Sequence, residues 1–285
     1  MPLQLSIRDV LKRKAPNAHV PEFLIRYLER ITHLEQMNAF LRIHTTERDY
    51  DFIRLVLDEE LGCSASIEGT ENIPDDGRPV IFAGNHPLGG LDGMIIAQMI
   101  HEARTERGNE RPLKVIVNDM LMHMEPLAGL WAPVNKVGRL SREQAAAQQA
   151  MWQSDTDVLT FPAGACSRLQ WIKRKWQIQD LEWHKNFIQR AREYQRDVVP
   201  VYFEGQNSRF FYTLAYIRKM LHIPVNIEML YLVDEMYGAH GKHFRVQVLP
   251  PIPYTTFDHS RTPLQWADYV KHYIYEKRTT NHSAR

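Results

Sequence analysis

The chain has 285 residues, of which 44% are hydrophobic and 24% are charged, so it can fold around a substantial core. Its formal net charge is +1, which argues against a dedicated nucleic-acid-binding protein, because such proteins usually carry a strong basic excess. Two cysteines, Cys63 and Cys166, do not make a disulfide framework and favour a reducing compartment.

The N-terminal part of the chain predicts helices. Apolar side chains recur at helical spacing through VPEFLIRYLERITHLEQMNAFLRIH. A second helical segment, TERDYDFIRLVLDEELG, has Thr45 or Thr46 as a candidate cap and Gly62 as a candidate stop. We therefore expect an N-terminal helical hairpin over residues 1–62. Its partly basic polar positions resemble those of helices on a membrane surface, and a helical cap packed on the sheet is an equal alternative.

From residue 63 onward, short apolar runs alternate with amphipathic stretches. The strand candidates are RPVIFAG, LKVIVN, DVLTFPA, DVVPVYF, VNIEMLYLV and HFRVQVL. The helix candidates are GMIIAQMIHEAR, SREQAAAQQAMWQ, DLEWHKNFIQRAREY, FYTLAYIRKML and TPLQWADYVKHYIY. This alternation predicts an α/β domain over residues 63–285, in which a mixed, mostly parallel sheet is flanked by helices on both faces.

Polar or unusual residues follow three of these predicted strands. In open α/β sheets, ligands bind beyond the carboxyl ends of the strands, so we expect the three segments to line one cleft. The residues concerned are His86 after VIFAGN; Gly164, Cys166, Ser167 and Arg168 after VLTFPA; and Glu204, Gly205, Gln206, Asn207 and Ser208 after VVPVYF.

The stretch AGNHPLGGLDGM places His86 six positions before Asp92. Neutral imidazole is a competent general base near neutral pH, and a carboxylate fixes its tautomer and stabilises its cation. Gly89 and Gly90 allow the chain to fold back and bring the two side chains together. The alternative is that Asp92 caps the following helix and that His86 is an ordinary loop histidine. Spacing alone leaves both interpretations open.

Three blocks of the sequence resemble the glycerolipid acyltransferase family of lysophosphatidate acyltransferases. IEGTENIPDDGRPVIFAGNHPLGGLDG is similar to the family's opening block, FPAGACSR to its FPEGTRS block and VVPVYFEG to its later Val-Pro strand, in the same order. The resemblance spans roughly residues 64–253. It implies that His86 deprotonates the acceptor hydroxyl as it attacks an acyl thioester, while Asp92 orients His86. It implies no bound cofactor, metal or covalent acyl-enzyme, since acyl-coenzyme A or acyl-carrier protein is the donor substrate.

The sequence departs from the family pattern at three places. Five residues separate His86 from Asp92 where the family usually has four, and Ala163 replaces the glutamate of FPEGTRS. KVGRLSRE matches the family's arginine block loosely, with Arg139 and Arg142 as candidates. NHPLGGLDG, FPAG and DLEWHKNFI together resemble the hemolysin-like bacterial branch, which includes acyltransferases that complete ornithine and glycine lipids.

The resemblance thus implies O-acylation of a lyso-amino-acid lipid of the ornithine or glycine type. Lysophosphatidate is the alternative acceptor, and a catalytically inactive lipid-binding protein of the same fold is a second alternative. Cys166 is expected to be a bystander beside the site, with a nucleophilic cysteine as the minor alternative. The candidate substrate-binding residues are Asn85, Gly89, Gly90, Arg139, Arg142, Gly164, Ser167, Arg168, Glu204 and Asn207.

The segment SRLQWIKRKWQ combines basic side chains with Trp171 and Trp176. Lys and Arg attract anionic lipid head groups, and Trp favours the membrane interface. The alternative is a solvated basic face whose tryptophans pack inward. The sequence also lacks the roughly 18 consecutive apolar residues that a membrane-spanning helix needs, and it begins without a signal-peptide core. We therefore expect a cytoplasmic protein that is peripheral to the inner face of the cytoplasmic membrane and has no nucleic-acid partner.

Overall fold

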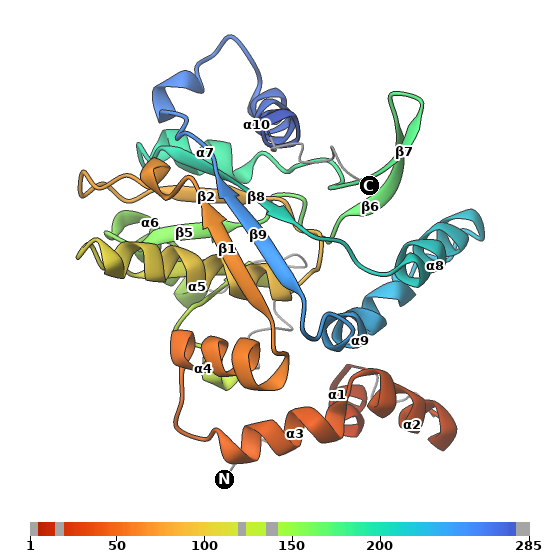
Figure 1. The fold of residues 1–285 in the computed structure, drawn as a ribbon. Helices are drawn as coiled ribbons and strands as arrows, with labels where there is room; N and C mark the ends of the chain where they lie inside the picture. The colour runs from red at the N-terminus through yellow and green to blue at the C-terminus, as the bar shows by residue number, and fades with distance from the viewer. Residues whose placement is uncertain (1–4, 15–19, 119–123, 135–141, 278–285) are drawn as a thin grey trace.

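The computed structural model describes residues 5–14, 20–118, 124–134 and 142–277 (Figure 1). Helices lie above and below a central sheet, and no helix in these ranges has the length and apolar character needed to cross a membrane. The α-helices are α1 (Ile7–Lys14), α2 (Glu22–Ile31), α3 (Leu34–Ile43), α4 (Asp49–Leu55), α5 (Leu91–Glu106), α6 (Arg142–Gln153), α7 (Asn186–Glu193), α8 (Arg209–Met220), α9 (Leu232–Tyr237) and α10 (Pro263–Lys277).

Within the described residues, the central sheet has seven strands in the order β1-β9-β8-β2-β5-β3-β4. All neighbouring strands in it pair in parallel except β8 and β9, which are antiparallel. The prediction of a mixed, mostly parallel sheet is confirmed. The sheet strands are β1 (Ser64–Glu68), β2 (Ile81–Gly84), β3 (Leu113–Asn118), β4 (Trp131–Val134), β5 (Asp157–Thr160), β8 (Val198–Glu204) and β9 (His243–Val248), and β6 (Arg168–Ile172) and β7 (Lys175–Gln179) form a separate antiparallel hairpin.

Apolar side chains on both faces of the sheet explain why the central strands read as continuous apolar runs. Successive side chains of a strand point to opposite faces. Along β2, Ile81 and Ala83 join a core with α7 and α10, whereas Phe82 joins a second core with α4 and α5. Figure 1 shows these helix pairs on opposite sides of the sheet, as the sequence predicts.

The N-terminal residues form more helical segments than the two predicted. The first predicted helix is divided into α2 and α3 at His33, whose φ of +48° is left-handed. Arg48, and not Thr45 or Thr46, immediately precedes α4. The chain then continues through a π-helical segment, η1 (Val56–Glu60), and ends its helical course before Gly62. Gly62 has a φ of +54°, so the predicted stop is confirmed.

The predicted strand VNIEMLYLV is wrong. Its residues form a 3-10 helix, η5 (Ile227–Tyr231), followed by the start of α9. A short apolar run does not distinguish a strand from a buried helical segment by periodicity alone. Glu228 within the run is buried between Arg168 and Arg218, a tertiary contact that local composition does not reveal. Four strands, β1, β4, β6 and β7, were not predicted from the sequence.

Candidate active site

The three strand ends that stood out in the sequence lie side by side. β8, β2 and β5 are adjacent and parallel, so their carboxyl ends meet at one edge of the sheet. The segment that leaves β5 contacts the one that leaves β2, because the Ser167 N–H donates to the His86 carbonyl at 2.8 Å. The segment that leaves β8 also contacts the one that leaves β2, because Asn207 Nδ2 donates to the Pro87 carbonyl at 3.2 Å. Three segments that are distant in sequence therefore meet around His86.

His86 and Asp92 lie together at the start of α5. The Nδ1 atom of His86 is 3.2 Å from Oδ1 of Asp92, whose side chain is fully buried, while that of His86 is 17% exposed. The turn closes on this carboxylate, because the N–H groups of Leu88 and Gly89 donate to Oδ2 at 2.9 Å and 3.4 Å. The Gly93 N–H donates to Oδ1 at 2.8 Å. The five intervening residues are thus accommodated without separating the two side chains.

Of the two glycines in this turn, Gly89 is the one that the geometry requires. Its φ is +79°, and a Cβ atom there would lie 3.0 Å from Leu232 Cδ1 and 3.3 Å from Cys166 Cβ. Gly90 has an extended φ of −176°, and a Cβ atom there would meet nothing within 4 Å.

Asp92 is held in its ionised form. Burial by itself raises the pKa of this carboxyl, but the charge of His86 and the hydrogen bonds from His86, Leu88 and Gly93 outweigh burial and lower the pKa. The carboxylate also lies in the first turn of α5, where the helix dipole favours negative charge. An ionised carboxylate beside Nδ1 favours the tautomer with the proton on Nδ1, which leaves the lone pair on Nε2.

A second buried carboxylate, Asp180, contacts the backbone of His86 and is not among the residues predicted from the sequence. Its Oδ1 atom accepts from the His86 N–H at 3.1 Å and from Ser167 Oγ at 2.6 Å. Its Oδ2 atom accepts from Trp183 Nε1 at 2.9 Å. Burial raises the pKa of Asp180, and these hydrogen bonds only oppose the rise. The available signal was an acid at the start of DLEWHKNF, directly after β7.

Asn85 and Asn207, both predicted to bind substrate, connect the loops of the site. Asn85 Nδ2 donates to the Phe203 carbonyl at 2.9 Å, and the Phe203 N–H donates back to Asn85 Oδ1 at 2.7 Å. Both asparagines are buried. The backbone N–H of Asn207 also donates to the Tyr212 hydroxyl at 3.0 Å, which fixes the position of this residue. These contacts hold the β2 and β8 ends together, and substrate binding by either residue stays a prediction.

Arg168 lies between Cys166 and the buried Glu228. One guanidinium nitrogen donates to the Cys166 carbonyl at 2.7 Å, and the other donates to Glu228 Oε1 at 2.9 Å. Arg218 Nε lies 2.9 Å from Glu228 Oε2. Burial raises the pKa of the Cys166 thiol, so the thiol is protonated at neutral pH and is a poor nucleophile. This supports the interpretation of Cys166 as a bystander.

Comparison with known proteins identifies the family of the chain. The family described as Acyltransferase matches residues 9–281 of the chain. The chain belongs to this acyltransferase family. It is 40% identical over 274 residues to a lyso-glycine lipid O-acyltransferase of Bacteroides thetaiotaomicron, with 95% of this chain and 97% of that protein covered. It is 42% identical over 274 residues to a lyso-glycine lipid O-acyltransferase of Phocaeicola vulgatus, with 95% and 94% covered. The predicted family resemblance and enzyme class are confirmed.

Among solved structures, the crystal structure of the 1-acyl-sn-glycerophosphate acyltransferase from Thermotoga maritima matches this acyltransferase with a TM-score of 0.45 and 16% sequence identity. The match covers 94% of this chain and 87% of that chain.

The remaining predicted residues have varied positions in the acyltransferase. Glu204 ends β8 with its side chain about half exposed, 3.8 Å from Arg245 of β9. Gly164 has a φ of +63° in the segment after β5. Arg142 is exposed at the start of α6, and Arg139 lies outside the described residues. Their roles in binding stay predictions.

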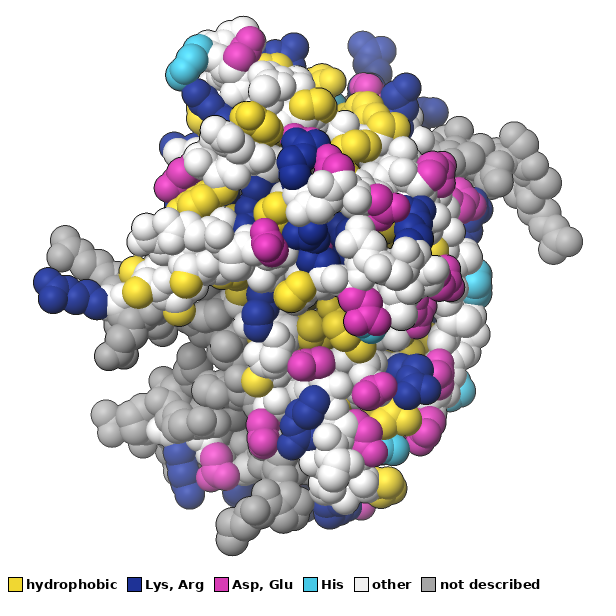
Figure 2. Space-filling model, turned by 90° about the vertical axis from the view of Figure 1, so that its left-hand side faces the viewer, with side chains coloured by type: hydrophobic (Ala, Val, Ile, Leu, Met, Phe, Trp, Pro, Cys, Tyr) yellow, Lys and Arg dark blue, Asp and Glu magenta, His cyan; other side chains and the backbone are white. Residues whose placement is uncertain are grey.

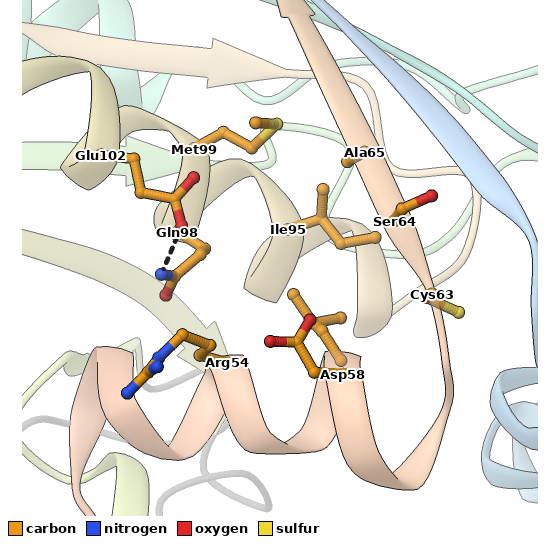
Figure 3. A pocket seen from close by; sticks show the side chains of 10 residues that line it. Arg54, Asp58, Cys63, Ser64, Ala65, Ile95, Gln98, Met99 and Glu102 are labelled. Carbon is orange, nitrogen blue, oxygen red and sulfur yellow. Dashed lines mark hydrogen bonds between the residues drawn. The ribbon is translucent and has the colours of Figure 1, made fainter.

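A pocket lies further along α5 from the candidate active site (Figure 3). In Figure 3, Arg54 of α4 and Asp58 of η1 approach it from one side and Gln98 and Glu102 of α5 from the other, with Gln98 Nε2 donating to Glu102 at 2.8 Å. None of the predicted site residues lines this pocket. This pocket is therefore separate from the candidate active site around His86.

Proposed function

We propose that this acyltransferase moves a fatty acyl group from an acyl thioester to the hydroxyl group of a lyso-amino-acid lipid of the glycine type. The observation that carries the proposed chemistry is the 3.2 Å approach of His86 Nδ1 to the buried Asp92 carboxylate. Support for the acceptor comes from two relatives, 40% and 42% identical over nearly the whole chain, that are named lyso-glycine lipid O-acyltransferases.

In this mechanism, the acceptor hydroxyl gives its proton to Nε2 of His86 while its oxygen attacks the carbonyl carbon of the thioester. Asp92 accepts a hydrogen bond from the Nδ1–H group, which keeps its proton, and stabilises the imidazolium that forms. The tetrahedral adduct then breaks its carbon–sulfur bond, and the proton on Nε2 passes to the departing sulfur. The products are an ester, a free thiol and a neutral imidazole, so the enzyme returns to its starting state.

Asp180 is a positioning residue in this proposal. It accepts from the backbone N–H of His86 and from the Ser167 hydroxyl, and so fixes the main chain from which the imidazole projects. The Phe161 ring stacks on the imidazole with a centroid distance of 4.3 Å. The segment after β5 and the loop after β7 thus restrain both the backbone and the ring of the base, which favours a productive geometry.

The donor in this proposal is acyl-carrier protein or coenzyme A carrying the acyl chain as a thioester, and the reaction takes place at the inner face of the cytoplasmic membrane. Supplying purified protein with each donor in turn, at equal acyl-chain length, distinguishes the two carriers by the rate of ester formation.

The proposal is tested by assaying purified wild-type protein and a His86→Ala variant with a labelled acyl thioester. The acceptors are lyso-glycine lipid, lyso-ornithine lipid and lysophosphatidate. Loss of a general base lowers the rate by about a hundredfold to ten-thousandfold, and we expect a loss in that range. His272→Ala is a matched control, because His272 is an exposed histidine of α10 that also approaches an aspartate.

Equal transfer by the wild type and His86→Ala would show that His86 is not the base. Transfer to lysophosphatidate alone would replace the proposed acceptor. A folded wild-type protein that transfers to none of the three acceptors from either donor would favour a lipid-binding protein that has kept the fold without the chemistry.

A further inference from the structure

The β6–β7 hairpin, α8 and the segment that continues from α8 through η5 expose many large apolar side chains, and we call this surface the aromatic face. It holds nine of the fifteen exposed large apolar side chains in the described part of the chain. Monomeric proteins rarely gather so many in one region unless the region is an interaction site. The nine residues are Trp171, Trp176, Phe210, Tyr216, Ile217, Met220, Leu221, Val225 and Leu230.

Ring contacts join the parts of the aromatic face. Trp171 and Trp176 pack edge to face across the hairpin with centroids 5.3 Å apart, and Trp176 packs on Tyr216 of α8 at 5.8 Å. At the other end of α8, Phe210 packs on Tyr231 of η5 at 4.9 Å. In Figure 1 the hairpin and α8 extend together from the right-hand side of the sheet. The tryptophans are more than half exposed, which contradicts the alternative that they pack inward.

The aromatic face is also strongly basic. Residues 168–179 and 209–227 contain seven Lys and Arg residues and no Asp or Glu, in a chain whose formal net charge is +1. Arg168 and Arg218 pair with the buried Glu228. The other five cations are exposed and form no ion pair within the described residues: Lys173, Arg174, Lys175, Arg209 and Lys219. Figure 2 shows the opposite side of the molecule, where Lys and Arg alternate with Asp and Glu.

We propose that the aromatic face docks on the surface of a lipid bilayer that contains anionic lipids. Indole rings favour the interface between head groups and acyl chains, and juxtamembrane Lys and Arg side chains are attracted to anionic lipids. Lys173, Arg174 and Lys175 form the tip of the same hairpin that carries the two tryptophans, so one projection offers both interactions. An anionic bilayer offers apolar acyl chains below negatively charged head groups. The aromatic face offers apolar side chains and basic side chains together, which suits both.

The aromatic face and the candidate active site are built from the same two segments. β6 begins directly after Ser167, whose N–H contacts the His86 carbonyl. α8 begins two residues after Asn207, which contacts the Pro87 carbonyl. The buried side of α8 packs against Cys166 through Phe211 and Tyr212. If the proposed function holds, docking on this face brings a membrane-borne acceptor to the segments that surround His86.

The basic part of the proposal is tested by flotation of the purified full-length protein with two kinds of vesicle, phosphatidylcholine alone and phosphatidylcholine with phosphatidylglycerol. Each cation near an anionic surface contributes about 1 kcal/mol, or roughly fivefold in binding. A Lys173→Gln, Lys175→Gln variant should therefore bind the anionic vesicles about 25-fold more weakly and bind the neutral vesicles as the wild type does. The control is Lys185→Gln, Lys242→Gln, which removes two exposed lysines outside the face.

The apolar part is tested with Trp171→Ala, Trp176→Ala, which should weaken binding to both vesicle types at least tenfold. A second variant, Met220→Ser, Leu221→Ser, tests the end of α8 without touching the hairpin. Leu264→Ala, Tyr269→Ala on α10 is the matched control, because these side chains are exposed outside the aromatic face. Circular-dichroism melting of every variant checks that it is folded.

Vesicle binding by the wild type that none of the face variants reduces would overturn the proposal. So would a wild type that binds neither vesicle, or one that binds only a protein partner through this face. Transfer assays with detergent-dispersed acceptor separate the two proposals. A wild type that transfers in detergent but binds no vesicle contradicts docking alone, whereas one that docks through the face but transfers nothing contradicts the proposed function alone.

Discussion

Asp92 and Asp180 are both fully buried carboxylates in contact with His86, yet their pKa values move in opposite directions. Burial raises the pKa of each. Asp92 faces an imidazole that can carry positive charge, and its pKa is lowered in spite of burial. At Asp180, the hydrogen bonds from Ser167, Trp183 and the His86 backbone, together with the charge of His86, do not offset burial, so its pKa is raised. Burial therefore prevails at Asp180, whereas at Asp92 the charge of His86 and the hydrogen bonds from His86, Leu88 and Gly93 together outweigh it.

The segments around His86 act on different parts of this residue. The turn after β2 supplies a charge that acts on the imidazole ring. The segment after β5, together with the loop after β7, supplies hydrogen bonds that act on the backbone of the same residue. Changes in the first loop should therefore damage the chemistry itself, and changes in the second should damage its geometry.

The largest effect is expected from Asp92→Asn. The amide keeps the size of the side chain but does not stabilise an imidazolium, so kcat/KM should fall by about a hundredfold to ten-thousandfold. Steady-state transfer assays measure the loss, with Asp58→Asn as a control at an exposed carboxylate. Activity close to that of the wild type would show that Asp92 does not act on the charge of the His86 imidazole.

Gly89→Ala should have the next largest effect, with Gly90→Ala as its matched control. A left-handed alanine costs about 1–2 kcal/mol, and the new Cβ must also displace Leu232 and the turn around His86. We expect a lower free energy of unfolding in urea and a loss of transfer approaching about a hundredfold, since a small misplacement of a catalytic group has that effect. Equal behaviour of the two variants would contradict the description of the turn.

Asp180→Asn should lower kcat by about tenfold to a hundredfold, because His86 loses part of its backbone support and keeps its charged partner. Since Asp92 is unchanged, the pH at which the rate is half-maximal should stay where the wild type has it. A shifted pH profile in transfer assays would mean that Asp180 acts on the ionisation of His86 and is more than a positioning residue.

Asp92→Asn and Asp180→Asn should change the pH dependence of the free energy of unfolding in opposite ways. The lowered pKa of Asp92 contributes stability above the unfolded-state value of about 3.9 that is lost as pH falls through the folded value. The raised pKa of Asp180 contributes stability below about 3.9 that is lost as pH rises through the folded value. On acidification, the free energy of unfolding of the wild type should thus fall toward that of Asp92→Asn. Relative to Asp180→Asn, it should rise. Urea unfolding from acid to neutral pH measures both slopes, and parallel slopes would contradict the comparison.

The smallest effect is expected from Cys166→Ala. The thiol is buried, and its raised pKa keeps it protonated, so the rate should fall far less than the roughly hundredfold that loss of a catalytic group causes. Transfer assays and slow labelling of the wild type by a thiol reagent check this. A loss as large as that of His86→Ala would revive the nucleophilic alternative.

Much of the central sheet was predictable because β2, β5 and β8 are apolar runs bounded by turn residues. The β6–β7 hairpin was not, for a local reason. Its two turn residues, Lys173 and Arg174, have φ values of +48° and +62°. Such hairpin turns usually carry Asn or Gly, so the ordinary turn signal is missing. The composition of VNIEMLYLV suits a strand, but the run forms η5 and the start of α9, where Glu228 makes buried ion pairs with Arg168 and Arg218.

The sequence by itself made a contact between His86 and Asp92 possible, because both lie within seven consecutive residues with Gly89 between them, but spacing alone left a capping aspartate and an ordinary loop histidine as the alternative. Only the tertiary structure decided that the ends of β8, β2 and β5 meet, and that Asp180 reaches the backbone of His86 across 94 positions of sequence. Local spacing restricts which neighbouring side chains can touch, but it says nothing about partners that strand order alone brings together. The raised pKa of Asp180 follows from its burial among such distant partners, so it too was decided by the fold.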